Sequence, residues 1–373
     1  MRHGRAATTP MRLQLTRKKK AGGAVGLEIE AGSIAAIEVQ GLNGSAAITA
    51  SAVEPLAPGV FHDGEVLDPD RLTQALKGLF ASHKLSKRVR LGVGNQNVVV
   101  RTVRLPVIED PKEMDAAVRF QAQEQIPMPL DQAVLEHQVV GGVPGEEGTK
   151  AQVDVIVVAA RREMVSSFVG PIRKAGLDPV GIDLSAFAMI RALADQGAAP
   201  QADQPGRQAD EAALYCNVGD VTNLAVARGR ACLFTRVSHV GLESTCEGLA
   251  GARGLTAEHA AQWVSYVGIE RPLEEIEGDP ETVAAARSAL EGGVDALLDE
   301  LRLSLDYYGA QAGALPVGRI VLGGAGSAIP GMARRMEENL GIPIQVARPA
   351  ALAGLGDEAA ARLTLSYGLA LES

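Results

Sequence analysis

Short apolar runs separated by polar turns dominate the start of the chain. They lie at about 24–30, 34–40 and 46–53, with glycine and polar residues between them. Runs of this length between such residues are typical of strands joined by tight turns. We therefore predict that the fold opens with a three-stranded meander.

A longer period follows at about 69–83. Leu72, Leu76 and Leu79 recur there at the spacing of one helix face. Asp68 stands directly before a proline, a pair that provides a helix cap and first turn. These features predict a helix, and the apolar residues after it predict a further strand.

The same order of elements returns in the second half of the chain. Strands are predicted at about 212–218, 222–228 and 231–237, helices at about 242–251, 256–267 and 280–309, a strand from Arg319 that ends in Gly-Gly-Ala-Gly, and a helix at about 330–340. Two such copies predict a pair of α/β domains related by a pseudo-twofold axis. The cleft between two such domains is the default place for a ligand.

The region between the copies has a pattern of its own. Strands are predicted near 97–104, 134–140, 151–159 and 178–183, and helices near 110–125 and 161–175. We interpret residues 95–182 as an inserted module. Residues 197–210 are rich in Pro, Gln, Ala and Asp without periodicity, which is typical of an inter-domain linker.

Charge is distributed unevenly along the chain. The net charge is −9, and because the first 20 residues carry seven Lys and Arg and no acid, the remainder carries −16. We expect residues 1–23 to form a flexible basic tail. Attraction of this tail to anionic lipid is the sharper alternative. Binding of nucleic acid is disfavoured because the acidic body would repel it, and a start at Met11 would leave the tail short.

Composition excludes several classes of protein. An apolar fraction of 46% supports a large core, but no apolar run reaches the roughly 18 residues of a membrane span, and no signal peptide is expected. Cys216, Cys232 and Cys246 are spaced too widely for a metal pair, so we expect buried thiols in a reducing, cytoplasmic compartment. No GxSxG, HExxH or Walker A sequence occurs, and no catalytic residue is predicted.

Several stretches resemble one protein family. The most specific, Ala117 to Asp131, reads "AVRFQAQEQIPMPLD"; "LAPGVFHDGEVLDPDRLTQALKGL", "VVVRTVRLP" and "RKAGLDPVGIDLSAFAMIRAL" add to it in the same order. Two meanders, an inserted module and a C-terminal glycine loop resemble the actin-like ATPases. Within that superfamily the chain is similar to the PilM family of type IV pilus assembly proteins, which is related to FtsA.

The resemblance implies a fold and its division into domains. The fold would be α/β, with duplicated actin-like (RNase H-like) domains, an inserted FtsA-type α+β module and a helical subdomain. The expected parts are a first domain at 24–94 completed by helices at 183–196 and 358–373, the module at 95–182, and a second domain at 211–357 with its helical subdomain at about 242–312. The C-terminal "RLTLSYGLALES" is expected to fold back onto the body as a helix.

The first hairpin departs from the family's nucleotide site. In the family it reads "VGLDIGSSSVKAVEL", in which Asp positions a Mg²⁺-bound water, Gly admits phosphate and Lys meets its charge. Glu28, Glu30 and Ala35 stand at these positions. A carboxylate at about 4 Å from a phosphate costs roughly 4 kcal/mol at a near-surface dielectric. Gly32 and Ser33 remain as possible donors.

The other contact regions are also altered. In the second hairpin Gly219 and Thr222 are kept, but Asn217 replaces the family's magnesium-side Asp. The helix that meets ribose and base in the family has Ala261 and Val264 at its two polar positions. The adenine-side loop keeps its glycines: Gly323, Gly324 and Gly326. We therefore predict a vestigial ATP site that needs no cofactor, binds ATP and Mg²⁺ weakly at most, and has no dedicated metal ligands.

The resemblance implies a scaffold rather than an enzyme. PilM-like proteins lie under the inner membrane and hold the N-terminal peptide of PilN, so we expect a PilN-like partner, other pilus components, and peripheral contact with the membrane. The groove would lie between the first domain and the inserted module, near parts of strand 97–104 and helix 110–125. An active ATP-binding switch, an FtsA-like filament-forming ATPase, and a kinase or Hsp70-type ATPase of the same fold are the alternatives.

Overall fold

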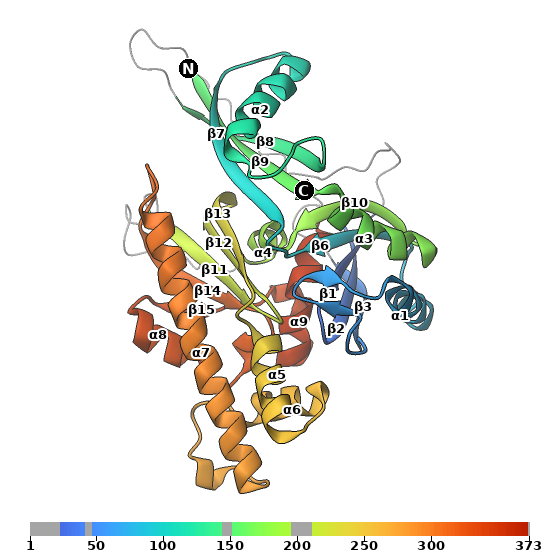
Figure 1. The fold of residues 1–373 in the computed structure, drawn as a ribbon, viewed down its shortest axis with the longest axis vertical. Helices are drawn as coiled ribbons and strands as arrows, with labels where there is room; N and C mark the ends of the chain where they lie inside the picture. Colours follow the sequence, from blue (N-terminus) through green and yellow to red (C-terminus); the bar gives the residue numbers. More distant parts are fainter. Residues whose placement is uncertain (1–22, 42–46, 144–150, 195–210, 372–373) are drawn as a thin grey trace.

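The computed structural model describes residues 23–41, 47–143, 151–194 and 211–371 (Figure 1). The predicted basic tail and the predicted linker lie outside these residues, apart from Gly23. Within the described part, every helix and strand predicted above is present, with ends that differ by a few residues at most.

The first domain is built on a five-stranded sheet in the order β10-β6-β1-β2-β3. Its strands are β1 (Val25–Ile29), β2 (Ser33–Gln40), β3 (Ala47–Pro55), β6 (Arg88–Val93) and β10 (Asp178–Leu184). Helices α1 (Pro69–Ser82) and α3 (Arg162–Lys174) pack on one face, and their apolar side chains join those of the sheet in one core. Asp68 accepts from the amides of Asp70 and Arg71, which confirms the predicted cap of α1.

The second domain repeats this arrangement in the order β13-β12-β11-β14-β15. Its strands are β11 (Ala212–Val218), β12 (Thr222–Arg228), β13 (Ala231–Ser238), β14 (Val317–Gly323) and β15 (Ile344–Val346). Helices α5 (Leu242–Arg253), α6 (Ala257–Val267), α7 (Pro280–Gly309) and α8 (Met332–Leu340) cover its outer face. Both sheets have two antiparallel and two parallel pairings in matching positions, which confirms the predicted duplication.

Two helices lie between the sheets. The C-terminal α9 (Asp357–Ala370) packs on β1 and β2, and α4 (Ser185–Leu193) packs on β11 and β12. Glycine permits the close approaches: a Cβ at Gly26 would lie 1.8 Å from the Ser366 carbonyl oxygen, and one at Gly368 would lie 2.0 Å from that of Ala188. The predicted folding back of the C-terminal helix is thus confirmed.

The inserted module is smaller than the sequence pattern indicated. Its sheet has the order β7-β9-β8 and is covered by α2 (Pro111–Gln125); the strands are β7 (Val98–Pro106), β8 (Ala133–Val143) and β9 (Gln152–Arg161). In the expected boundaries of 95–182, α3 and β10 belonged to the module as well. The topology places both in the first domain, because β10 pairs with β6 and α3 packs against α1.

Two smaller points concern the membrane and the thiols. Within the described ranges, no helix has both the length and the apolar character needed to cross a bilayer. Cys216, Cys232 and Cys246 are buried and free, as predicted. Burial raises the pKa of each thiol to about 12, so these cysteines are chemically inert core residues.

Candidate functional site

The two domains face each other through equivalent turns. The β1–β2 turn carries Glu30 and Gly32, and the β11–β12 turn carries Gly219 and Asp220. Because β1 and β11 hold matching places in their sheets, the two turns meet at the cleft between the domains. These are the turns whose backbone amides the resemblance assigned to phosphate groups.

Each turn binds a carboxylate of the other. The Gly32 amide donates to Asp220 Oδ2 at 3.0 Å, and the Ala31 amide also donates to this carboxylate. In return, the Asp220 amide donates to the Glu30 carboxylate. Amides grouped in a turn form a concave site for anions. Protein carboxylates therefore accept the hydrogen bonds that phosphate oxygens would otherwise accept.

The space between the turns is small. A Cβ at Gly219 would lie 2.2 Å from Glu30 Oε1, so the absence of a side chain at Gly219 leaves room for the Glu30 carboxylate. The cavity that remains measures about 20 Å³ and is lined by Glu28, Glu30, Asp220 and Glu243 among others. A volume of this size holds about one water molecule. The protein's own carboxylates therefore fill most of the space directly between these two turns.

The carboxyl groups in the cleft hold protons more tightly than usual. Burial, together with the charges of Asp220 and Glu28, raises the pKa of Glu30 to about 8. Burial also raises the pKa of Asp220, against the two amide donors and the Arg362 guanidinium of α9. Arg362 also lowers the pKa of Glu30. It places a positive charge near this carboxylate, whereas Ala35, at the position of the family's Lys, provides none.

Glu28 is buried behind this contact. Ser185 Oγ donates to its Oε1 at 3.0 Å, whereas its Oε2 has no hydrogen-bond partner among the described residues. Burial raises the pKa of Glu28 to about 7. Asn217, the other residue at a predicted magnesium-side position, also has an unpartnered oxygen. Each unsatisfied buried oxygen costs on the order of 1–3 kcal/mol.

Ser33 and Thr222, which were also predicted to contact a nucleotide, take part in hydrogen bonds within the protein. The Ser33 carbonyl accepts from the Glu30 amide at 2.9 Å, and the Thr222 hydroxyl donates to the Val240 carbonyl at 2.6 Å. Ala35 is buried against α9. Of the predicted contact residues in the two hairpins, Gly32 and Gly219 are the ones that take part in the contact between the domains.

The adenine-side residues divide into two groups. Gly324 has φ +79° and Gly326 lies against Val218, so the glycine loop, which begins at Gly323, packs tightly on the end of β11. Ala261 and Val264, at the two positions that are polar in the family, form the second group. Both pack into the core of the second domain, because the apolar stripe of α6 faces α5 and α7.

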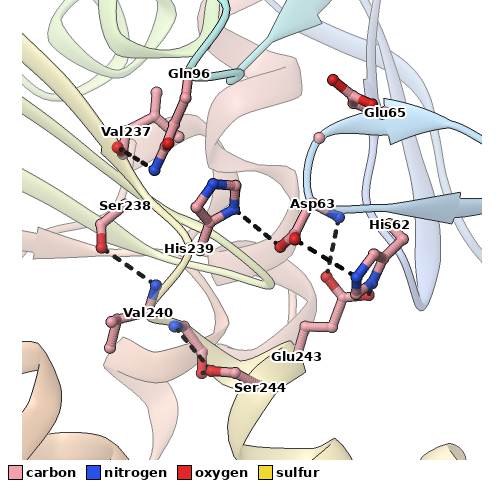
Figure 2. Close-up of polar contacts among 12 residues, drawn as sticks. His62, Asp63, Glu65, Gln96, Val237, Ser238, His239, Val240, Glu243 and Ser244 are labelled. Carbon is pink, nitrogen blue, oxygen red and sulfur yellow. Dashed lines mark hydrogen bonds and ion pairs between the residues drawn. The ribbon is translucent and has the colours of Figure 1, made fainter.

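Several residues of the cleft were not found from the sequence. Asp220 and Arg362 lie in segments that only the fold brings to Glu30. Figure 2 shows a further polar group at the rim of the cleft, in which His62 and Asp63 of one domain meet Glu243 and His239 of the other. One local signal in the sequence could have indicated this polar group: His62 stands beside Asp63 in a turn bounded by glycine.

A groove lies beside the cleft, between the module and the second domain. Its volume is about 330 Å³, and it is lined by consecutive residues of β7 from Val98 to Arg101 and of β13 from Thr235 to Val237. Leu184 and Ala186, at the start of α4, are part of its apolar wall. Gln96 Nε2 donates to the Val237 carbonyl at 3.2 Å and links the two sides (Figure 2).

Both strands of the groove are edge strands. Among the residues that the structure describes, β7 pairs only with β9 and β13 pairs only with β12. Successive residues of a strand point to opposite faces. A groove that contacts three or four residues in succession therefore runs along the backbone edge of each strand.

The fold and the pair of facing turns define an actin-like protein. Solved structures show the same fold: EutJ of Carboxydothermus hydrogenoformans has a TM-score of 0.54 at 14% identity, covering 97% of this chain and 94% of its own. MreB5 of Spiroplasma citri bound to AMPPNP has a TM-score of 0.51 at 10% identity, with 94% and 95% covered.

Within this class the family is defined by the sequence. The model of the family "Type IV pilus assembly protein PilM" matches residues 26–373, and the chain therefore belongs to this family. A chain from a solved PilM-PilN type IV pilus biogenesis complex is similar to it, with a TM-score of 0.75 and 28% identity over 94% of this chain and 98% of that one. The actin-like fold and the family predicted from the sequence are thereby confirmed.

Proposed function

We propose that this protein is a scaffold of the type IV pilus assembly machine, and that it binds the N-terminal peptide of a PilN-like inner-membrane protein without nucleotide. The observation that carries this proposal is the groove between the edge strands β7 and β13. The similar solved chain comes from a complex of PilM with PilN, which supports the choice of partner. Attachment to the inner membrane would then come from the partner.

The groove has the properties that an extended peptide needs. An edge strand offers unpaired N–H and C=O groups, and a peptide can add to it as a further strand. Val98 and Val100 turn their side chains toward the core around α4, and with Leu184 and Ala186 they offer apolar contacts for alternate side chains of the peptide. Backbone pairing would supply affinity, and these apolar positions would supply specificity.

The cleft supports the second half of the proposal. Asp220 and Glu30 already satisfy the amides of the opposite turns, so bound phosphate would have to displace both carboxylates. Glu30 would also repel it. We infer that Gly32, Ser33, Gly219, Thr222 and the loop from Gly323 to Gly326 are the remains of an ATP site that the scaffold does not use.

The test is a titration of the full chain with a peptide from the cytoplasmic N-terminus of a PilN-like protein, by calorimetry without ATP. Val100→Glu places a carboxylate in the groove and is expected to weaken binding at least tenfold, because about 1.4 kcal/mol corresponds to that factor. Val107→Glu is the matched control, since Val107 is exposed just beyond the end of β7. Equal losses in both variants, or binding that requires ATP, would overturn the proposal.

The structure also decides which variants are unsuitable. Removal of residues 95–182 would take α3 and β10 out of the first domain, so loss of binding would report unfolding. Gly324→Arg is a poor control because it would also disturb the fold. Its Cβ would lie 2.6 Å from the Val218 carbonyl oxygen, in a backbone conformation with φ +79°.

A further inference from the structure

The polar group at the rim of the cleft joins the two domains. His62 and Asp63 lie in the hairpin of β4 (Phe61–His62) and β5 (Glu65–Val66), which belongs to the first domain. Glu243 lies in the first turn of α5, and His239 precedes that helix. Figure 2 shows the four side chains pointing toward one another across the boundary. None of them takes part in the contact between the turns or lines the groove.

Three of these side chains have the spacing of metal ligands. His62 Nδ1 lies 2.8 Å from Glu243 Oε1, and His62 Nε2 lies 3.5 Å from Asp63 Oδ2. One ligand atom from each of His62, Asp63 and Glu243 lies within 4.8 Å of the other two. Zn²⁺ bonds of about 2.0–2.2 Å place tetrahedral ligand atoms roughly 3.3 Å apart, so small side-chain movements suffice.

Hydrogen bonds orient the two carboxylates. Asp63 Oδ1 lies 3.0 Å from His239 Nδ1. The Asp63 amide donates a hydrogen bond to Glu243 Oε2 at 3.4 Å. Partners of this kind are typical of the surroundings of metal sites, where they fix the ligand that they contact. His239 is thus placed to position Asp63 rather than to bind a metal itself.

The charge of the group favours a cation. His62 lies among three carboxylates, because Glu247 Oε1 is 3.8 Å from its Nδ1 in addition to the contacts with Asp63 and Glu243. Within the part of the chain that the structure describes, the ion pairs of these three carboxylates are all with histidines. Three carboxylates around the single His62 imidazole leave an excess of negative charge in either protonation state of His62.

We propose that His62, Asp63 and Glu243 form a binding site for a divalent transition-metal ion such as Zn²⁺, which would tie the β4–β5 hairpin of the first domain to α5 of the second. One imidazole with two carboxylates and a water suits Zn²⁺ or Co²⁺, whereas Mg²⁺ and Ca²⁺ take oxygen ligands. This site lies at the rim of the cleft, where Glu243 also lines the small cavity between the turns, and it does not rest on the proposed peptide binding.

The experiment is a titration of the chelator-treated full chain with Zn²⁺ by calorimetry, and with Co²⁺ by visible absorption. We expect one site with a Kd below 100 µM, on the order of −5.5 kcal/mol or better, and a rise of the melting temperature with added Zn²⁺. His62→Ala and Glu243→Gln are expected to lower the affinity at least tenfold. His239→Ala should lower it less, because it removes a positioning residue.

His83→Ala is the matched control. His83 Nε2 lies 2.7 Å from Glu54 Oε1 in an exposed pair of the first domain, so its loss should leave the affinity unchanged. Melting without metal establishes that each variant is folded. Absence of saturable binding in the wild-type chain would overturn the proposal, as would equal affinities in wild type, His62→Ala and Glu243→Gln. In either case the group would be a hydrogen-bonded contact alone.

Discussion

The cleft and the groove differ in whether their backbone groups are already satisfied. In the cleft, the amides of both turns donate to Asp220 and Glu30, and about 20 Å³ remains. The groove measures about 330 Å³ and runs along two edge strands. Backbone groups that are still unpaired can accept a peptide as an added strand, whereas groups already paired within the protein must first lose their partners. The comparison indicates that the position of a ligand site inherited with the fold does not by itself decide where this protein can bind a ligand.

The largest expected effect is a gain in ATP affinity when the carboxylates that fill the cleft are replaced. Glu28→Asp, Glu30→Gly, Ala35→Lys and Asn217→Asp together restore the family's residues, and adding Asp220→Ser also frees the amides of the first turn. We expect the five-fold variant to bind ATP and Mg²⁺ at least 100-fold more tightly than wild type, equivalent to about 2.7 kcal/mol. Calorimetry measures this gain.

Two comparisons sharpen that result. The variant that retains Asp220 should gain less, because this carboxylate still occupies the first turn. Affinity for the partner peptide should stay within about threefold of wild type, a difference below about 0.7 kcal/mol. An unchanged affinity for ATP in the five-fold variant would mean that these side chains are not what closes the site.

The pH dependence of stability is expected to be smaller. Glu28 has a folded-state pKa of about 7 against an ordinary 4.5, so between these values the folded state binds more protons than the unfolded state. The free energy of unfolding therefore falls as pH rises through this window. Glu28→Gln removes the titration and still accepts from Ser185, so we expect it to stabilise the protein by on the order of 2 kcal/mol at pH 8.

Urea unfolding at pH 8 and at pH 4.5 measures this effect. Glu30 remains in the variant, and burial still raises its pKa although the Glu28 charge no longer adds to the rise, so some loss of stability with rising pH should persist. The gain from Glu28→Gln should disappear at pH 4.5, where the wild-type carboxyl is largely protonated when folded. A gain of equal size at both pH values would point to packing rather than proton binding.

The smallest expected effect concerns the contact between the turns. Asp220→Asn keeps an acceptor for the Gly32 and Ala31 amides and removes the charge that faces Glu30. We expect a change of about 1 kcal/mol or less in the free energy of unfolding, and a lower pKa for Glu30, because the Asp220 charge is one cause of its rise. Carbon-13 NMR of the glutamate carboxyls measures that pKa, and Asp70→Asn, an exposed surface change, is the control.

Local patterns were sufficient for the elements and for the duplicated order. The Asp68 cap, the stripe of α1 and the turns of both meanders depend on residues a few positions apart, so propensity and periodicity describe them well. The ordered set of stretches between Leu56 and Leu193 was sufficient for the family. The replacement of family residues by Glu30 and Asn217 was likewise visible without any structure.

Contacts between distant segments were decided only by the tertiary structure. Asp220 meets Gly32 across 188 positions, His62 meets Glu243 across 181, and β10 joins β6 after the whole module has intervened. The burial of Val264 in the second core is of the same kind. The sequence by itself determined which elements form and what chemistry each turn carries. The packing of the two domains decided which turns meet, because that depends on the summed burial of faces that no short stretch of sequence contains.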